Sequence, residues 1–398
     1  MKVVNRLVKL WVLPLLLVAG LALSSCGKDS GGEQGGGTSG NGQGSTEQPQ
    51  QEYVKLNKSA VELSVNGQAT IVPEFSSEAV RQKGFTWTTD KPDVIAIANN
   101  ADGSVTVTAL SAGVARLSIE ANDQSLLAAC QIAVFAEGEE VVRILGIGNS
   151  FTVNAMDGYL YDLMVAGGKK VVVAYLAIGG ATLEDHLGNA QANTAAYQYV
   201  RMAQGGRTNT YGKTIADVVA SEPWDYICFQ QQSWLSGQFA SYQPYIPALV
   251  AYVKSKSTNP DAVYAVLQTW AFAYNYGYDD YDYYDNNQLT MHAALVDAAR
   301  RASQQVTPNM MVVPAGTAIQ NGRTTVIGDG FCSDGYHLNS VGCFTVACTW
   351  YEAVFGDNVS NNPYKPQGIS DYNIEIAKAA ARYAVQNPEV VTDMVGYK

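Results

Sequence analysis

The stretch that decides the fold is Val141-Val-Arg-Ile-Leu-Gly-Ile-Gly148-Asn-Ser150-Phe-Thr152. It opens with a continuous, largely apolar run, and a run without alternation is typical of a strand buried on both faces. Similar runs at 171–178, 226–229, 262–267 and 310–313 are separated by helix-compatible sequence. Such strands between helices predict an α/β domain, in which helices cover both faces of a parallel sheet.

Functional residues of such sheets gather just past the carboxyl ends of the strands. Four strand ends are informative here: Gly148-Asn-Ser150, Ile178-Gly-Gly180-Ala, Phe229-Gln-Gln231-Gln232-Ser and Asp334-Gly-Tyr-His337. Taken singly, each is also compatible with an ordinary turn, a helix cap or a surface loop. The chain has three histidines, of which His337 alone has a carboxylate three residues before it in a glycine-containing loop. A triad enzyme would therefore take His337 as its base.

In this order, the Ser150, Gly180 and Asp334-x-x-His337 motifs resemble blocks I, II and V of the SGNH (GDSL-like) hydrolases. The resemblance spans about residues 144–355. It implies a three-layer α/β/α, flavodoxin-like fold and a serine esterase mechanism. Ser150, His337 and Asp334 would be catalytic, and the backbone N–H groups of Ser150 and Gly180 would bind the oxyanion.

One departure concerns the block III asparagine of the family, whose amide helps to hold the oxyanion. Glutamine occupies its place in this chain, and it carries the same donor on a stem one methylene longer. We expect Gln231 to fill the role, with Gln232 as the second choice. Sialate and xylan acetylesterases of the superfamily resemble this chain in their glutamine-containing block III, which favours an acylated carbohydrate as the substrate.

The segment Tyr274-Asn-Tyr-Gly-Tyr-Asp-Asp-Tyr-Asp-Tyr-Tyr-Asp285 is rich in tyrosine and aspartate. It is either a lid whose rings stack on sugars or an irregular exposed loop. Its aspartates do not match the spacing of a calcium loop, and we expect no metal and no cofactor. Trp234 and Trp270 are candidates for lining the substrate cleft.

Residues 52–137 alternate apolar and polar side chains in short segments separated by glycines, which predicts an all-β sandwich. The motifs at 85–94, 103–110 and 113–117 resemble the group 2 bacterial immunoglobulin-like domains. That resemblance implies a spacer or adhesion module, followed by a hydrolase domain at 139–398. The Gly- and Ser-rich residues 27–51 predict a flexible linker.

Lys2, Arg6 and Lys9 precede an apolar run that ends in Leu23-Ser-Ser-Cys26. This is the pattern of a lipoprotein signal peptide at 1–26, with Cys26 as the lipidated residue; a plain secretory signal or a membrane span are the alternatives. The expected location is the cell envelope, with a lipid anchor in the membrane.

The net charge of −11 argues against nucleic acid as a partner, because nucleic-acid binding relies on cationic groups. The alternative to an esterase is a non-catalytic, glycan-binding or adhesive surface protein on a degenerate hydrolase fold. Retention of Ser150, Asp334 and His337 together favours the enzyme.

Overall fold

The computed structural model describes residues 52–398, except 59, 137, 139, 205, 278, 307 and 308. The predicted signal peptide, Cys26 and the linker 27–51 lie outside the described residues. Within the described part of the chain, no helix combines the length and the apolar character needed to cross a membrane.

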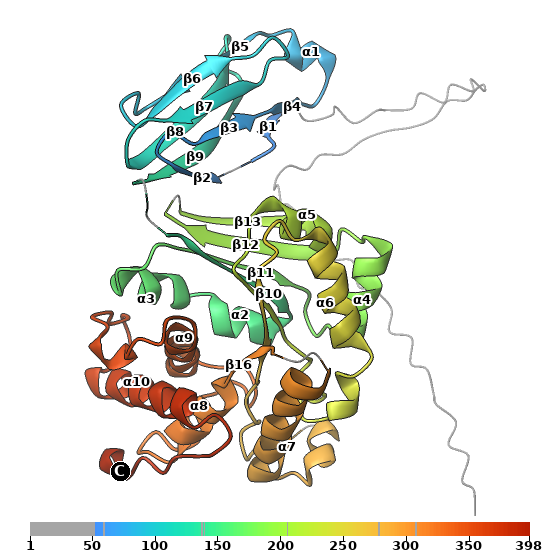
Figure 1. The fold of residues 1–398 in the computed structure, drawn as a ribbon, viewed down its shortest axis with the longest axis vertical. Coiled ribbons are helices and arrows are strands. Elements are labelled where there is room, and N and C mark those ends of the chain that lie inside the picture. Colours follow the sequence, from blue (N-terminus) through green and yellow to red (C-terminus); the bar gives the residue numbers. More distant parts are fainter. Residues whose placement is uncertain are drawn as a thin grey trace, which may run out of the picture. The chain divides into compact units, whose positions relative to one another are not determined.

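The larger sheet has seven strands in the order β13-β12-β11-β10-β14-β15-β16 (Figure 1). Their bounds are Val142–Gly148 (β10), Val171–Ala177 (β11), Tyr197–Ala203 (β12), Gly206–Lys213 (β13), Tyr226–Phe229 (β14), Val263–Leu267 (β15) and Met311–Val313 (β16). The five strands β11, β10, β14, β15 and β16 are parallel, and β12 and β13 form an antiparallel hairpin at one edge. In chain order the parallel strands read 2-1-3-4-5, which is the flavodoxin-like arrangement.

Helices cover both faces of this sheet, as expected for strands that are apolar on both sides. One face packs against α2 (Ser150–Met156), α3 (Leu160–Ala166), α8 (Ala315–Arg323), α9 (Ser340–Phe355) and α10 (Asp371–Gln386). The other face packs against α4 (Leu183–Ala192), α5 (Ile215–Ser221) and α6 (Tyr245–Lys256), whereas α7 (Gln288–Arg301) contributes to both cores. The three-layer α/β/α fold is therefore confirmed.

The strand order places a topological switch at β10 and β14. The chain leaves β10 toward β11 on one side, whereas β14 lies on the other side of β10. In open α/β sheets the loops diverge at such a point and leave a crevice outside the strand ends. The carboxyl ends of β10 and β14 carry Ser150 and the run of three glutamines, so the predicted site residues meet at the switch point.

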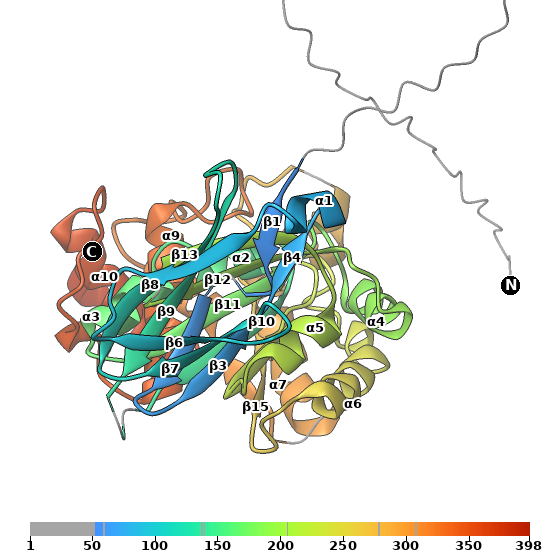
Figure 2. The same cartoon turned by 90° about the horizontal axis from the view of Figure 1, so that it is seen from above.

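The N-terminal strands form two main sheets, β2-β9-β8-β5 and β3-β7-β6, which enclose a common apolar core. Figure 2 shows β6, β7 and β3 side by side. The elements are β1 (Val54–Leu56), β2 (Ala60–Ser64), β3 (Gln68–Ile71), β4 (Pro73–Phe75), α1 (Glu78–Arg81), β5 (Phe85–Thr89), β6 (Ile95–Asn99), β7 (Val105–Ala109), β8 (Gly113–Ala121) and β9 (Leu127–Phe135). A two-sheet β structure is thus present, whereas its immunoglobulin-like kinship and its predicted boundaries at 52–137 stay predictions.

Candidate active site

Ser150 lies where β10 passes directly into α2. Asn149 caps the helix, because its side-chain oxygen accepts the backbone N–H of Phe151 at 3.0 Å. Ser150 is consequently the first residue of the helix, at the carboxyl end of the central strand. A methyl group on Gly148 would overlap the side chains of Thr152 and Gln230, so a residue without a side chain is required immediately before this turn.

Ser150, His337 and Asp334 form a continuous chain of hydrogen bonds. The Nε2 atom of His337 lies 2.8 Å from Ser150 Oγ, and its Nδ1 atom lies 2.7 Å from Asp334 Oδ2. Asp334 Oδ1 also accepts the backbone N–H groups of Tyr336 at 3.1 Å and His337 at 2.7 Å. The spacing of three residues works because Gly335 adopts a left-handed backbone, with φ +95°, which a glycine accepts without strain.

The same contacts set the ionisation of the carboxylate. Burial by itself would raise the pKa of Asp334, but the hydrogen bonds from the His337 ring and from two backbone N–H groups outweigh burial and lower its pKa. Asp334 is therefore ionised near neutral pH and accepts the Nδ1 proton, which leaves Nε2 with its lone pair toward Ser150 Oγ.

Contacts from α2 and from the segment after β15 hold the loop that carries His337. Asn154 Oδ1 accepts the backbone N–H of Leu338 at 3.0 Å, and Trp270 Nε1 donates to the carbonyl of Tyr336 at 2.7 Å. The Trp270 ring stacks on Phe151, with the ring centres 4.4 Å apart and the planes 5° from parallel. Trp270 is fully buried, at 0% exposure. Its predicted place in the cleft lining is corrected, because a side chain closed off from solvent supports the loop and does not meet a substrate.

Two backbone N–H groups, one in the turn after β10 and one in the turn after β11, remain available. Neither Ser150 N nor Gly180 N makes a hydrogen bond within the described residues. Gly180 has φ +69° and open space where a Cβ would be. Asn149 ties the two turns together, since its Nδ2 donates to the carbonyl of Ala181 at 3.0 Å. Sequence reasoning missed Asn149 and Asn154, because amides at turns and caps are common and give no specific signal.

The three glutamines after β14 have different surroundings. Gln230 Oε1 accepts Asn149 N at 2.9 Å and Thr152 Oγ1 at 3.0 Å, so it supports the serine turn. Gln231 is buried, with 1% exposure, and all of its amide is engaged. Its Oε1 accepts Leu183 N at 3.0 Å and Gln232 N at 2.8 Å, and its Nε2 donates to Ser241 O at 2.9 Å and Ser241 Oγ at 3.0 Å.

Gln232 is half-buried, and its Oε1 accepts the Trp234 N–H at 3.1 Å. Its Nε2 lies 3.4 Å from Ser233 Oγ, which is a long and weak contact. The side-chain N–H groups of Gln232 are therefore largely available to a ligand, whereas those of Gln231 are bonded to Ser241. The oxyanion role expected of Gln231, with Gln232 as the second choice, stays a prediction; of the two side chains, Gln232 has the less engaged amide donor.

The aromatic-acidic segment is partly ordered into a short 3₁₀ helix, Asp279–Tyr284 (η2), and packs beside the His337 loop. The Tyr276 and Tyr336 ring centres are 5.4 Å apart, and the Tyr283 and Trp234 ring centres are 5.2 Å apart. Tyr283 is 63% exposed and Tyr274 is 74% exposed. Aromatic faces open to solvent therefore lie on elements that contact the loops of Gln232 and His337.

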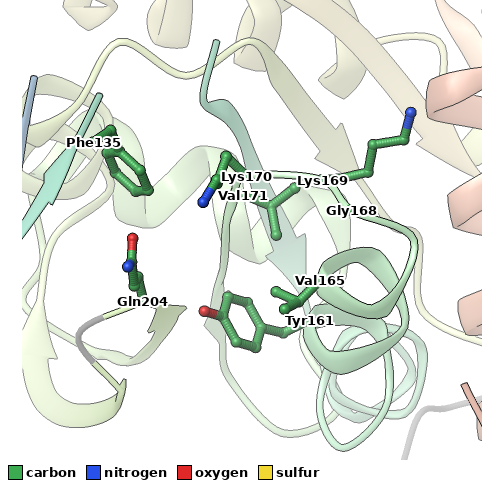
Figure 3. A pocket seen from close by; sticks show the side chains of 8 residues that line it. All are labelled: Phe135, Tyr161, Val165, Gly168, Lys169, Lys170, Val171 and Gln204. Atoms are coloured by element: carbon green, nitrogen blue, oxygen red, sulfur yellow. The ribbon is translucent and has the colours of Figure 1, made fainter. Parts of the chain in front are cut away.

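A separate hollow of about 210 Å³ lies away from these residues (Figure 3). It is lined by Phe135, Tyr161, Val165, Gly168, Lys169, Lys170, Val171 and Gln204. Val171 begins β11, and Ala177 ends it beside the Gly180 turn, so the hollow is at the opposite end of the sheet from Ser150. It contains neither a hydroxyl–imidazole pair nor a carboxylate. Within the described residues, no group of three or more His, Cys, Asp or Glu side chains is placed to hold a metal ion.

The protein is thus a flavodoxin-like α/β domain in which a serine after β10 is hydrogen-bonded to a histidine, and that histidine to an aspartate, in the loop between α8 and α9. A family model described as a domain of unknown function (DUF4886) matches residues 143–384, more than half of the chain. The chain belongs to the DUF4886 family.

Solved structures give two further comparisons. The chain is similar to the crystal structure of a DUF4886 family protein from Bacteroides uniformis, at 40% sequence identity and a TM-score of 0.63, over 65% of this chain and 100% of that one. A carbohydrate acetylesterase from Xanthomonas citri matches at 11% identity and a TM-score of 0.36, over 75% of this chain and 74% of that one. A likeness as weak as the latter carries no functional information. A search of curated proteins found no match.

Proposed function

We propose that the protein is a serine esterase of the SGNH type. The observation that carries the proposal is the succession of Ser150 Oγ, the His337 ring and Asp334 Oδ2 at 2.8 and 2.7 Å. A hydroxyl beside an imidazole that a carboxylate orients is the arrangement that activates serine for attack on a carbonyl. A binding protein has no chemical need for the three groups in this order.

In the proposed reaction, His337 Nε2 takes the proton of Ser150 as Oγ attacks the ester carbonyl carbon. Asp334 holds the imidazole orientation and stabilises the imidazolium that forms. The tetrahedral intermediate collapses, the alcohol leaves with the proton from His337, and an acyl group remains on Ser150. Water then attacks the acyl group in the same way, with His337 again acting as the base, and the free acid is released.

The developing oxyanion needs donors placed in advance. We assign this role to the N–H groups of Ser150 and Gly180 and to Gln232 Nε2. The two N–H groups make no other hydrogen bond within the described residues, and Gln232 Nε2 makes only a weak one at 3.4 Å. The position of Ser150 N at the start of α2 adds the favourable end of the helix dipole.

An acyl ester of a carbohydrate is the proposed substrate class. Trp234 follows Gln232 by two residues and pairs with the exposed ring of Tyr283, so a flat apolar face borders the proposed oxyanion site. Such faces accept the C–H side of a sugar ring and leave its hydroxyls free for hydrogen bonds. Trp234 therefore keeps its predicted substrate-binding role within this proposal.

A fluorophosphonate probe tests the chemistry directly, because it reacts with activated serines. We expect labelling of the native protein and none of Ser150→Ala or of heat-denatured protein. Absence of labelling in folded wild-type protein would support the non-catalytic glycan binder instead.

The substrate class has its own test. Trp234→Ala should slow acetate release from acetylated xylan more than it slows hydrolysis of p-nitrophenyl acetate, since the small ester has no sugar to stack. Tyr211→Ala is the matched control, because this exposed tyrosine lies on β13 at the sheet edge. Equal losses on both esters for Trp234→Ala would contradict a sugar-binding role.

We also propose that the protein is held in the cell envelope by lipid at Cys26, on the sequence pattern of residues 1–26 alone. Metabolic labelling with a fatty acid should mark the wild-type chain and not Cys26→Ser. Labelling of that variant would contradict the proposal.

A further inference from the structure

A hollow lies among the N-terminal strands, apart from the residues around Ser150. It has a volume of about 390 Å³ and is lined by Pro73, Phe75, Arg81, Phe85, Trp87, Asn99, Asn100, Asp102, Gly103, Ser104 and Ile119. Its volume is within the usual range of small-ligand sites, roughly 300–1,000 Å³. Apolar rings and polar side chains meet in it, which is the composition of a binding pocket and not of an ordinary gap in a core.

The position of the hollow follows from the sheet order. β5 is the edge strand of one sheet and β6 is the edge strand of the other. Phe85 and Trp87 alternate with the exposed Thr86 and Thr88, so their rings share the face of β5 that turns toward the core, and Ile119 of β8 is buried behind them. Both rings remain half-exposed. Within the described residues, no further strand pairs with the free edge of β5 or of β6 and covers them.

The aromatic rings are held in place. Trp87 Nε1 donates to the carbonyl of Gly103 at 3.3 Å, which fixes the ring relative to the β6–β7 turn. The Phe75 and Phe85 ring centres are 4.8 Å apart, with the planes tilted by 47°. The rings thus offer a preorganised apolar surface, and a preorganised surface loses little conformational entropy when it binds a ligand.

Polar groups at the hollow remain available for a ligand. The side chain of Asn99 is exposed and makes no hydrogen bond within the described residues. Arg81 is 58% exposed and lies 4.0 Å from Glu78, which is a weak surface pair. Asp102 Oδ1 accepts hydrogen bonds from the backbone N–H of Ser104 at 3.0 Å and from its hydroxyl at 2.6 Å. The rings are therefore surrounded by a hydrogen-bond donor (Arg81), an acceptor (Asp102) and an amide that can both donate and accept (Asn99).

We propose that this hollow binds a segment of a neutral carbohydrate chain. A sugar ring can place its C–H face on Trp87 while its hydroxyls both donate to Asp102 and accept from Arg81 and Asn99. One cationic and one anionic side chain balance each other at the rim, so the hollow does not select a strongly charged ligand. A proline-rich peptide also favours aromatic grooves, but it offers mainly carbonyl acceptors and would leave Asp102 without a donor.

The choice of acetylated xylan as the first probe rests on the proposed esterase function. A chain that carries both sites would keep a polymer close to Ser150 after each cleavage, because attachment through one site raises the effective concentration at the other. The second site should therefore matter for polymers and not for small esters.

The experiment measures binding of the full-length protein to acetylated xylan, β-glucan and mannan by affinity electrophoresis in a Ser150→Ala background, which prevents hydrolysis. Trp87→Leu should weaken binding to at least one polymer by about tenfold. Asn99→Ala, an exposed change that leaves the core intact, should weaken it by a smaller factor. Thr88→Ala is the matched control on the opposite face of β5, and it should bind as the parent does.

Thermal unfolding of each variant separates loss of the site from loss of the fold, and Asn99→Ala alone keeps the test decisive if Trp87→Leu does not fold. The proposal is overturned if no polymer binds, if Asn99→Ala and a folded Trp87→Leu bind as Thr88→Ala does, or if a polyproline peptide binds there in preference to the polymers. Hydrolysis of p-nitrophenyl acetate by the same variants with Ser150 restored should be unchanged. If the wild-type protein does not hydrolyse p-nitrophenyl acetate, the proposed esterase function is refuted, whereas the proposed binding site is not.

Discussion

The two neighbouring glutamines after β14 give the sharpest test of the proposed site, because their hydrogen bonds assign them opposite roles. Gln232 Nε2 has a single weak contact at 3.4 Å, whereas Gln231 is buried and bonded through both ends of its amide. We expect Gln232→Ala to reduce turnover and to lower stability less than Gln231→Ala does, because the acceptor that it removes serves the half-buried Trp234 N–H. We expect Gln231→Ala to reduce stability first.

The magnitudes follow from the contacts that each change removes. Loss of one oxyanion donor typically lowers kcat by about 10²–10³, or roughly 2.7–4 kcal/mol of transition-state stabilisation. Gln231→Ala instead leaves the N–H groups of Leu183 and Gln232 without their acceptor, and an unsatisfied buried donor costs about 1–3 kcal/mol. For two such groups we expect the free energy of unfolding to fall by roughly 2–5 kcal/mol. The upper value assumes that water hydrates one of the two N–H groups and lowers its cost.

The assay compares steady-state hydrolysis of p-nitrophenyl acetate with urea unfolding of the same preparations. Gln232→Glu is a useful third variant, since it keeps the size of the side chain and replaces the donor by a negative charge. It should be at least as inactive as Gln232→Ala. The reasoning is refuted if Gln231→Ala loses kcat at unchanged stability while Gln232→Ala remains fully active.

Three other perturbations have defined outcomes. Burial lowers the pKa of His186 and of His292 to about 4 from 6.5, so the unfolded chain binds more protons between these values. The free energy of unfolding should fall as the pH drops from about 6.5 toward 4, by up to about 3 kcal/mol per histidine; a urea midpoint that stays constant from pH 7 to 4.5 would contradict this. Trp270→Phe keeps the stack on Phe151 but removes the N–H that binds the Tyr336 carbonyl, so we expect a loss of about 1–3 kcal/mol in stability together with a lower kcat; unchanged values of both would show that the bond does not hold the loop. Gly180→Ala meets no atom but forces φ +69° on a residue with a Cβ, at about 1–2 kcal/mol, whereas Gly179→Ala, also in open space and without a positive φ, should unfold like wild type in a thermal melt; equal melting temperatures for the two variants would argue against the left-handed turn.

Much of the fold could be read from the chain because its parallel strands are apolar on both faces. The runs predicted at 226–229 and 171–178 match β14 and β11 to within one residue. The hairpin of β12 and β13 was missed, since Tyr197–Ala203 mixes polar and apolar residues and its partner strand is largely exposed. An edge hairpin lacks the continuous apolar signal of a central strand.

The hydrogen-bonded chain of Ser150, His337 and Asp334 could be predicted because each residue follows a strand end or a tight turn, and such positions leave few possible arrangements. The finer assignments could not be made from sequence. Which amide of Gln231 and Gln232 is free depends on where Leu183 and Ser241 lie, and both come from other parts of the chain. In the same way, nothing in the sequence distinguishes a tryptophan that lines a cleft from one that is buried beneath a loop, as Trp270 is.

The short spacing of Asp334 and His337 has a consequence for how this site can diversify. Two of the three residues in the hydrogen-bonded chain lie within four consecutive positions, and one hydrogen bond, between His337 and Ser150, joins them to the serine across 187 positions. Segments between Ser150 and the Asp334–His337 turn can vary as long as the strands of the sheet keep their positions. The tyrosine-rich stretch before α7 is one such segment. Tyr276 packs on Tyr336 of the His337 loop, whereas the exposed Tyr274 and Tyr283 can change the substrate side without altering the Asp334–His337 turn.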